Sequence, residues 1–398
     1  MTDSSTYPTP NDPAVVLQPG KDKAIRNRHH WIFSGAVRRL PEFEDGALLP
    51  VRSADGGFLG FGYFNRRSSI IGRMINFDST PPLEALDKSL DRAFALRTAA
   101  LGNSTDARRL VNSEGDGLPG LIIDRYGDVL VLQISTLGID RLKPWLLDVL
   151  EKRTSPVAVL EKSNLPSRKE EGLFPYEGLL RGTIPDSLQI LENGLRFRVD
   201  PAVSQKTGFY LDQRENRDLV RRWSSGRRVL NAFCYTGGFT VAALAGGAVA
   251  VESVDISAPA VDLARTNVAL NGFEGPGQTF VVADAFEYLR RRELNFDLII
   301  LDPPAFAKRK GDIVAACRGY KDIHRIVFQK IPEGALVLTF SCSYFVDEKL
   351  FRQVVFQAAG EAGRRVRIIG RHRQAADHPL NVFHPEGDYL KGFLLYVD

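Results

Sequence analysis

The sequence has few cysteines, three among 398 residues, and their odd number leaves at least one thiol unpaired. So small a set does not make a disulfide framework, and a reducing compartment such as the cytoplasm is expected. The paired Cys/His spacing of zinc sites is also missing, so we expect no metal. No run of about 18 apolar residues occurs, which excludes a predicted transmembrane helix and a membrane partner.

The N-terminal residues 1–13 are rich in Ser, Thr and Pro and lack the apolar core of a secretory signal, so they predict a disordered leader. The formal net charge of the chain is only +4. Residues 14–78 nevertheless contain ten Lys/Arg and six Asp/Glu, so positive charge is concentrated in this short segment. It indicates either an anionic partner or a solvated charged surface.

Three regions differ in their apolar pattern. Residues 14–80 are short apolar runs broken by Gly, Asp and Asn, which is typical of a small β-barrel. Residues 81–188 mix strands and helices and predict a central α+β domain. Residues 189–398 begin with a hairpin at Asn193-Gly194 and continue as alternating strands and helices. That alternation predicts an α/β, doubly wound domain with a parallel sheet covered on both faces.

The central region contains three elements with clear patterns. Residues 83–100 have apolar side chains at helical spacing, and residues 121–134 read as a hairpin with a tight turn. Residues 140–152 predict a single amphipathic helix.

In a doubly wound sheet the ligand lies beyond the carboxyl ends of the strands, at the switch point. The first strand of this region, residues 228–232, runs into a turn where Gly237 lets the backbone approach a ligand closely. The turn is not GxGxxG, which disfavours a pyrophosphate ligand. Asp255 ends the second strand, 18 residues after Gly237, where an acid commonly accepts ribose hydroxyls. Ser257 is the better N-cap for the next helix, which frees Asp255 for the ligand.

Two further acids follow strands. Asp284 comes after the third strand and is interpreted either as an acceptor for an adenine amino group or as a helix N-cap. Asp302 ends a very apolar strand, and Pro303 and Pro304 fix the exit of the chain behind it. An acid held there is hard to explain by packing, so Asp302 is expected to face the ligand.

The order of these motifs resembles class I methyltransferases, and most closely the PUA-containing family of 23S ribosomal RNA cytosine-5 methyltransferases. The resemblance covers nearly the whole chain. It rests on the following motifs: VLNAFCYTGGFT, VDIS, DAF, LDPPAFAKRK, HHWIFSGAV near the N-terminus, KTGFYLDQR at 206–214, and DHP and YLKG near the C-terminus.

By this resemblance the cofactor is S-adenosylmethionine, the partner is ribosomal RNA, and the chain forms a homodimer. One departure is Cys234, where many members have Ser. The resemblance implies that the turn residues Phe233, Thr236 and Gly237 contact the cofactor. Asp255 would bind its ribose and Asp284 its adenine. The remaining implied contacts are Asp302, and Gln213 and Arg214, which would help to close the site.

Cys342 follows the fifth strand and should reach the same sheet edge as Asp302. A thiolate adding to carbon 6 of cytosine makes carbon 5 nucleophilic, which is the covalent catalysis that this base requires. Asp302 could hydrogen-bond the base and support charge. The alternative is that Cys342 is a small buried apolar residue. Cys234, in the cofactor turn, and Cys317, on the following helix, are less well placed.

Basic residues near the predicted site suit an RNA backbone. Lys308, Arg309 and Lys310 follow Asp302 and form either a phosphate track or a solvated loop. A target base must be single-stranded or flipped to reach such a site.

The N-terminal region offers a second basic group. Arg26 and Arg28 stand beside aromatic residues, as in many RNA modules. Trp31 and Phe33 themselves are expected in the core of the barrel.

The sequence therefore predicts a three-domain RNA cytosine-5 methyltransferase. The alternatives are methylation of a guanine in ribosomal RNA, a non-catalytic RNA-binding assembly factor, and a methyltransferase for small molecules or proteins. Undiminished activity of a Cys342→Ala variant would favour methylation of guanine. RNA binding without methyl transfer would favour the assembly factor. Turnover in the absence of RNA would favour a methyltransferase for small molecules or proteins.

Overall fold

The computed structural model describes residues 7–201 and 207–398. The N-terminal six residues of the predicted leader, and Lys206 of the KTGFYLDQR motif, lie outside this range. The chain forms two compact units. The first consists of the described residues up to Ile190 and those within 199–211 and 376–387, and the second of residues 191–198, 212–375 and 388–398.

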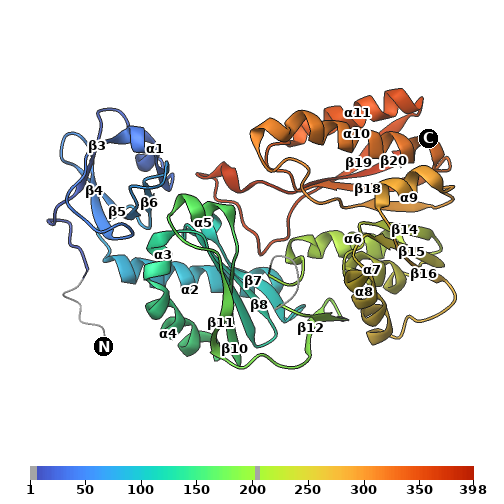
Figure 1. Cartoon of the computed structure of the whole chain (residues 1–398), viewed down its shortest axis with the longest axis horizontal. Coiled ribbons are helices and arrows are strands. Elements are labelled where there is room, and N and C mark those ends of the chain that lie inside the picture. Colours follow the sequence, from blue (N-terminus) through green and yellow to red (C-terminus); the bar gives the residue numbers. More distant parts are fainter. Residues whose placement is uncertain (1–6, 202–206) are drawn as a thin grey trace. The chain divides into compact units, whose positions relative to one another are not determined.

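The first unit begins with a mixed six-stranded sheet, whose strands run in the order β2-β6-β5-β4-β1-β3. Figure 1 shows this part of the chain in blue. Its core contains Val15, Leu17, Phe64 and Met74. The elements are β1 (Val15–Leu17), α1 (Lys23–Arg26), β2 (Trp31–Ile32), β3 (Val37–Arg39), β4 (Leu48–Arg52), β5 (Phe58–Phe64) and β6 (Gly72–Met74).

A five-stranded sheet in the order β11-β10-β9-β8-β7 forms the rest of the first unit, together with the long helix α2. The predicted hairpin is confirmed, because β8 and β9 pair antiparallel. The elements are α2 (Pro82–Leu101), β7 (Ala107–Asn112), β8 (Leu121–Tyr126), β9 (Val129–Ile134), α3 (Leu137–Arg141), α4 (Lys143–Thr154), β10 (Ala158–Ser163), α5 (Pro166–Glu170) and β11 (Tyr176–Gly182).

The single helix expected over residues 140–152 is wrong, because the structure has two helices there. The first, α3, ends at Arg141, and α4 begins at Lys143 with Pro144 in its first turn. Proline has no backbone N–H and its ring clashes with the carbonyl four residues earlier, so it begins a helix and does not continue one.

The Asn193-Gly194 hairpin is confirmed as the pairing of β12 (Leu188–Glu192) with β13 (Leu195–Val199). Asn193 and Gly194 have φ angles of +50° and +82°. Two successive left-handed residues are what a type I′ turn requires.

The second unit contains a seven-stranded sheet in the order β16-β15-β14-β17-β18-β20-β19, which confirms the predicted doubly wound α/β domain. Its elements are α6 (Arg214–Trp223), β14 (Arg228–Ala232), α7 (Gly238–Ala245), β15 (Ala250–Asp255), α8 (Ala258–Leu270), β16 (Gln278–Val282), α9 (Ala285–Arg291), β17 (Leu298–Leu301), α10 (Ile313–Lys330), β18 (Ala335–Ser341), α11 (Glu348–Ala362), β19 (Val366–His372) and β20 (Lys391–Val397).

Helices cover both faces of this sheet (Figure 1). Alternate strand residues face opposite cores: Leu230 packs with residues of α9, α10 and α11, and Val229 with residues of α6 and α7. Burial on both faces explains the continuous apolar runs of these strands.

One strand departs from the parallel pattern. β20 lies between β18 and β19 and pairs antiparallel with both. The strand order reverses between β14 and β17, so the switch point lies where these two strands end. No helix in the described ranges is long and apolar enough to cross a membrane.

Candidate active site

The strand register brings the predicted site residues to one edge of the sheet. Ala232, the last residue of β14, pairs with Val254 and with Leu301. The residues that follow these three, Phe233, Asp255 and Asp302, therefore leave the sheet side by side.

The turn after β14 has an unusual backbone. Phe233, Tyr235 and Gly237 have φ angles of +63°, +47° and +78°. The first two carry side chains that disfavour this region, and such strain is typical of functional sites. At Gly237 an added Cβ would lie 2.8 Å from the Cβ of Ala264, so only glycine fits without movement.

Asp255 holds this turn. Its Oδ2 accepts a hydrogen bond from the amide of Tyr235, and its Oδ1 accepts one from the amide of Ser257, both over 2.9 Å. Ser257 caps α8 through the amide of Ala260, which confirms the prediction that Ser257 is the N-cap. Each oxygen of the half-buried Asp255 carboxylate can still accept a further bond, as a ribose acceptor must.

Asp284 is the N-cap of α9, since its Oδ1 accepts from the amide of Glu287 over 3.0 Å. The structure thus shows the N-cap interpretation. The carboxylate is exposed, and its contact with an adenine stays a prediction.

Asp302 belongs to a chain of hydrogen bonds. Gln213 donates from Nε2 to Asp302 Oδ2 over 3.0 Å, and Asn216 donates to Gln213 Oε1 over 2.6 Å. Gln213 is buried, and the bond from Asn216 fixes which way its amide points. Gln213 therefore reaches the carboxylate at the switch point, although it lies 89 residues earlier in the chain.

Arg214 has a different surrounding. Its Nε lies 3.4 Å from Glu192 Oε2, and Arg217 binds the same carboxylate through two bonds of 2.6 and 2.7 Å. The buried Arg214 guanidinium thus contacts the β12–β13 hairpin, and its role in closing a cofactor site stays a prediction.

Cys342 lies beside the Asp302 turn. Its Sγ is 3.9 Å from the carbonyl oxygen of Pro303, and the side chain is half-buried. On both sides of Cys342, Ser341 and Ser343 hydrogen-bond the hydroxyl of Tyr320 over 3.0 Å. The structure therefore brings Cys342 and Asp302 together, as the sequence predicts.

The other cysteines are less suited to nucleophilic catalysis. Burial, with a contribution from the Asp255 charge, raises the pKa of the Cys234 thiol far above its usual range. Burial also raises the pKa of Cys317, which lies on α10 and packs against the core. A thiol with a raised pKa provides less thiolate at neutral pH.

The basic residues after Asp302 are exposed, on the loop between β17 and α10. Arg309 lies 3.7 Å from Asp312, a pair that solvent screens. The loop thus offers cationic side chains on the chain that leaves the switch point.

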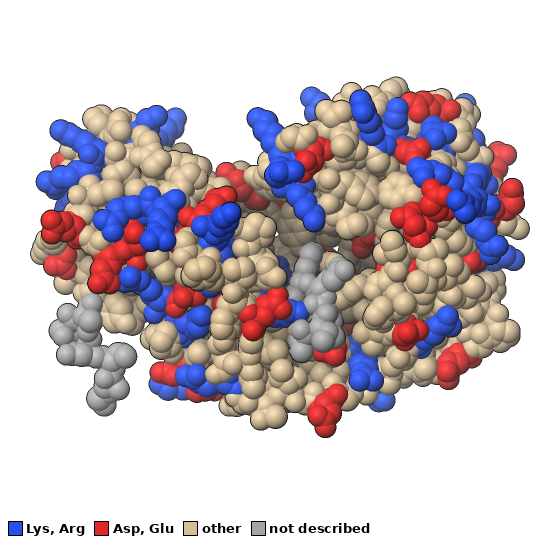
Figure 2. All heavy atoms as spheres, in the orientation of Figure 1, with Lys and Arg blue, Asp and Glu red and all other residues tan. Residues whose placement is uncertain are grey.

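The N-terminal basic residues are also exposed, and Arg26 pairs with Asp22 over 2.6 Å. Arg28 has a φ of +62°. In Figure 2, Lys and Arg side chains of the N-terminal sheet are interspersed with acidic ones. The expectation that Phe33 is a core residue is wrong, because 52% of it is exposed, whereas Trp31 is half-buried and donates to Glu114 over 2.8 Å.

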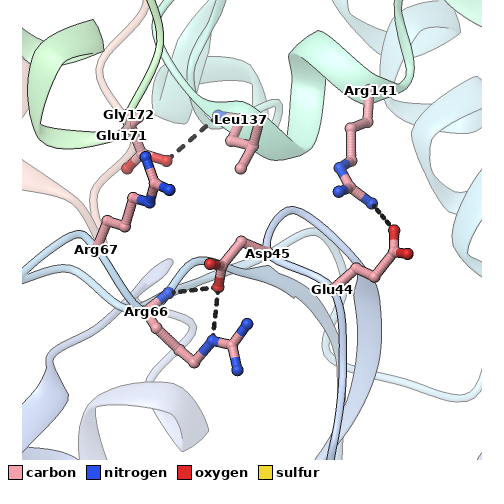
Figure 3. Close-up of a pocket in the computed structure, with 8 residues that line it drawn as sticks. All are labelled: Glu44, Asp45, Arg66, Arg67, Leu137, Arg141, Glu171 and Gly172. Carbon is pink, nitrogen blue, oxygen red and sulfur yellow. Dashed lines mark hydrogen bonds and ion pairs between the residues drawn. The ribbon is translucent and has the colours of Figure 1, made fainter.

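A cavity of about 390 Å³ lies in the first unit between β-strand loops and α3 (Figure 3). Two of its three arginines are paired with acids: Arg66 bonds Asp45 over 2.9 Å, and Arg141 bonds Glu44 over 2.9 Å. The acidic partners offset the positive charge, so the cavity is not a simple anion site. It is lined by Glu44, Asp45, Arg66, Arg67, Leu137, Arg141, Glu171 and Gly172.

Three side chains of the first unit have the composition of a metal site. The ligand atoms of His29, His384 and Glu386 lie within 4.8 Å of one another. The amide of Trp31 donates to Nδ1 of His29 over 3.2 Å, so the neutral ring carries its proton on Nε2, which faces Glu386. That nitrogen has no lone pair for a metal, and the group is better explained as hydrogen-bonded packing. Burial lowers the pKa of His384, which favours its neutral form.

The turn has features that fit a bound cofactor. The Oγ1 of Thr236 is buried and has no hydrogen-bond partner among the described residues. Gly237 next to it removes the side chain that would keep a ligand from the backbone. Phe233 packs edge-on against Phe286, which leaves an aromatic wall at this edge.

Sequence reasoning missed two residues of this edge, Asn216 and Lys391. Asn216 lies on α6, a helix in which charged and polar residues outnumber the apolar ones. Lys391 opens the apolar strand GFLLYV, and a lysine in such a run was the available signal.

The parallel sheet, its switch point and the strained glycine turn define the class I methyltransferase fold. Residues 177–367 match a family described as S-adenosylmethionine-dependent methyltransferase, and residues 15–77 match a PUA-like domain. Both the predicted cofactor and the predicted PUA-like fold are thereby confirmed.

Relatives cover the whole chain. Ribosomal RNA large subunit methyltransferase I of Salmonella arizonae is 41% identical over 100% of both chains. The protein of that name from Shewanella denitrificans is 40% identical over 96% of this chain and 99% of its own. A crystal structure of SMU.776, described as a methyltransferase complexed with SAH, has the same fold, with a TM-score of 0.82, 24% identity and coverage of 96% and 99%. The chain therefore belongs to the ribosomal RNA large subunit methyltransferase I family of S-adenosylmethionine-dependent methyltransferases.

Proposed function

We propose that the chain methylates carbon 5 of a cytosine in large-subunit ribosomal RNA, with Cys342 as the nucleophile. The names of its relatives support the RNA substrate. The observation that carries the choice of base is the position of Cys342 Sγ, 3.9 Å from the carbonyl oxygen of Pro303, the residue that follows Asp302.

When bound, S-adenosylmethionine supplies an electrophilic methyl group. Phe233, Thr236 and Gly237 would contact it, and Asp255 would accept its ribose hydroxyls. Asp284 would reach the adenine, and Gln213 and Arg214 would close the site.

The Cys342 thiolate adds to carbon 6 of the cytosine, which forms a C–S bond and makes carbon 5 electron-rich. Asp302 accepts a hydrogen bond from the exocyclic amino group and so orients the base. After carbon 5 is methylated, a water molecule accepts its proton, the C5–C6 double bond re-forms, and the C–S bond breaks to release the Cys342 thiolate. Gln213 keeps the Asp302 carboxylate in place during these steps.

RNA binding in this proposal uses two basic groups. Lys308, Arg309 and Lys310 would contact phosphates near the flipped base, and Arg26 and Arg28 would contact RNA from the PUA-like domain. The proposal keeps a three-domain division at 14–80, 81–188 and 189–398, a homodimer and a cytoplasmic location.

The test is transfer of a tritiated methyl group to unmodified ribosomal RNA, followed by nucleoside analysis. We expect 5-methylcytosine with the native chain, and a loss of at least about 1,000-fold in rate with Cys342→Ala, because the covalent step is removed. Cys317→Ala is the matched control and should retain the native rate.

Labelled methylguanosine, formed at an undiminished rate by Cys342→Ala, would contradict the cysteine mechanism and favour the related guanine reaction. RNA binding without any methyl transfer would instead favour an assembly factor.

A further inference from the structure

A buried lysine lies next to the candidate nucleophile. Lys391 opens β20 and pairs in register with Ser341, the last residue of β18 and the neighbour of Cys342. Because β20 is antiparallel to β18, its first residue stands where β18 ends. The side chain is only 3% exposed.

The ammonium group of Lys391 binds the backbone on both sides of this position. Its Nζ donates to the carbonyl of Ser343 over 2.8 Å and to that of Tyr389 over 2.7 Å. One bond therefore fixes the chain directly after Cys342, which itself is held by Ser341 and Ser343 through Tyr320. Carbonyl oxygens can anchor an ammonium but do not neutralise it.

A buried lysine is costly unless it has a role, since an apolar or amide side chain could occupy the start of a strand. Burial lowers the pKa of Lys391 to about 8, so near neutral pH it is mostly charged but close to its titration. The charged groups that act on Lys391 are Asp388, Cys342, Asp347 and Arg373. Tyr320, whose pKa burial raises to about 12, is acted on by both Cys342 and Asp302.

We propose that Lys391 is a positioning residue for Cys342, because it fixes the turn that carries the thiol and stabilises the thiolate with its positive charge. The inference rests on the proposed role of Cys342 as nucleophile. A nearby ammonium favours the ionised form of a thiol and so increases the fraction that can attack carbon 6. A negative charge such as the Asp302 carboxylate at the same edge disfavours a thiolate, and a nearby cation offsets this effect.

The test measures the reactivity of the thiol itself, without RNA. The full chain is alkylated with iodoacetamide between pH 5.5 and 9.5, and modification of the Cys342 peptide is followed by mass spectrometry. Two variants separate charge from hydrogen bonding: Lys391→Gln keeps a donor and removes the charge, and Lys391→Arg keeps the charge.

We expect Lys391→Gln to move the alkylation midpoint upward by about one pH unit and to lower the rate at pH 7 about tenfold. Lys391→Arg should stay within about threefold of the native rate. Lys330→Gln is the matched control, because Lys330 also binds backbone carbonyls, those of Leu289, Arg290 and Arg292. Lys330 ends α10 before β18 begins, whereas Cys342 follows the other end of β18.

An unchanged midpoint in Lys391→Gln, or equal shifts in both variants, would overturn the proposal. If neither variant folds, the pH dependence of Cys342 alkylation in the native chain is the test. A midpoint below the ordinary cysteine pKa of about 8.5 supports the proposal, and a midpoint at or above it overturns the proposal. The readout is independent of the proposed reaction. A shifted profile together with a methylated guanine product would refute the cytosine reaction and leave the Lys391–Cys342 coupling standing.

Discussion

Gln213 donates a hydrogen bond to the carboxylate of Asp302, over 3.0 Å, from a residue placed just before α6. The bond ties the segment that precedes the methyltransferase sheet to the strand end at its switch point. Loss of this segment should therefore be felt at the site, although its residues lie far from Asp302 in the chain.

Replacement of Gln213 tests this connection. Gln213→Leu keeps the volume and removes both hydrogen bonds, so we expect it to lower the free energy of unfolding by about 1–3 kcal/mol and the rate of methyl transfer at least tenfold. Urea unfolding and single-turnover methyl transfer measure the two effects. Asn271→Leu is the control, because it removes bonds of similar length to the backbone of Arg196 in the same unit. An equal loss of activity in both variants would show that Gln213 acts only through stability.

The geometry of the turn after β14 predicts that replacing Gly237 lowers both the stability of the fold and the affinity for the cofactor. Gly237→Ala places a Cβ 2.8 Å from that of Ala264 at a φ of +78°, so it should both destabilise the fold by about 1–3 kcal/mol and raise the dissociation constant of S-adenosylmethionine at least tenfold. Gly272→Ala is the matched control, with a φ of +69° and no atom within 4 Å. Calorimetric titration should show cofactor binding unchanged in Gly272→Ala, and equal affinities in the two variants would contradict this role of Gly237.

His324 predicts a loss of stability in acid. Burial lowers its pKa to about 4, while the unfolded chain titrates near 6.5, so the folded state resists protonation. Stability from this group is complete above about pH 6.5 and falls as the pH drops towards 4. We expect a loss of about 2 kcal/mol between pH 7 and pH 5.

Denaturant unfolding at these two pH values measures the His324 effect. In His324→Gln the difference between pH 7 and pH 5 should shrink by most of that amount, because glutamine can still bond Thr339 but does not titrate. A difference of native size in this variant would assign the acid sensitivity to other groups.

The exposed loop after Asp302 predicts a salt-dependent contribution to RNA binding. The double variant Lys308→Gln/Lys310→Gln should weaken RNA binding severalfold and reduce the slope of log affinity against log salt by about 1–2, while cofactor affinity stays native. Filter binding over a salt series measures both quantities. Lys321→Gln/Lys349→Gln, on α10 and α11, removes the same charge elsewhere, and an identical loss in that variant would mean that only net charge matters.

Local signals made part of the fold predictable. The bounds of α8 follow from Ser257 at its start and Asn271-Gly272 after its end, since capping chemistry depends on neighbours in the chain. The Asn193-Gly194 turn could be predicted for the same reason, because turn type depends on adjacent residues. The polar helix α6 was missed, because its burial depends on contacts that no short window of sequence contains.

The candidate site divides in the same way. Asp255, Asp302 and Cys342 could be predicted because each ends or directly follows a strand, and parallel strands end at one edge. Lys391 was visible as a lysine in an apolar run, but its place at the site was not predictable, since its contact with Ser343 spans 48 residues and depends on the antiparallel insertion of β20. Phe33 was predicted in the core but is exposed, so an aromatic residue in an apolar run need not be buried.

The place of β20 in the sheet has a consequence for synthesis. It comes later in the chain than both strands between which it is inserted. While the polypeptide is still emerging from the ribosome, β18 and β19 have no partner between them, and each keeps an open edge that could pair with another chain. A nascent chain halted before Lys391 should therefore recruit chaperones and lack a competent thiol, so maturation of the enzyme waits for this strand to be made.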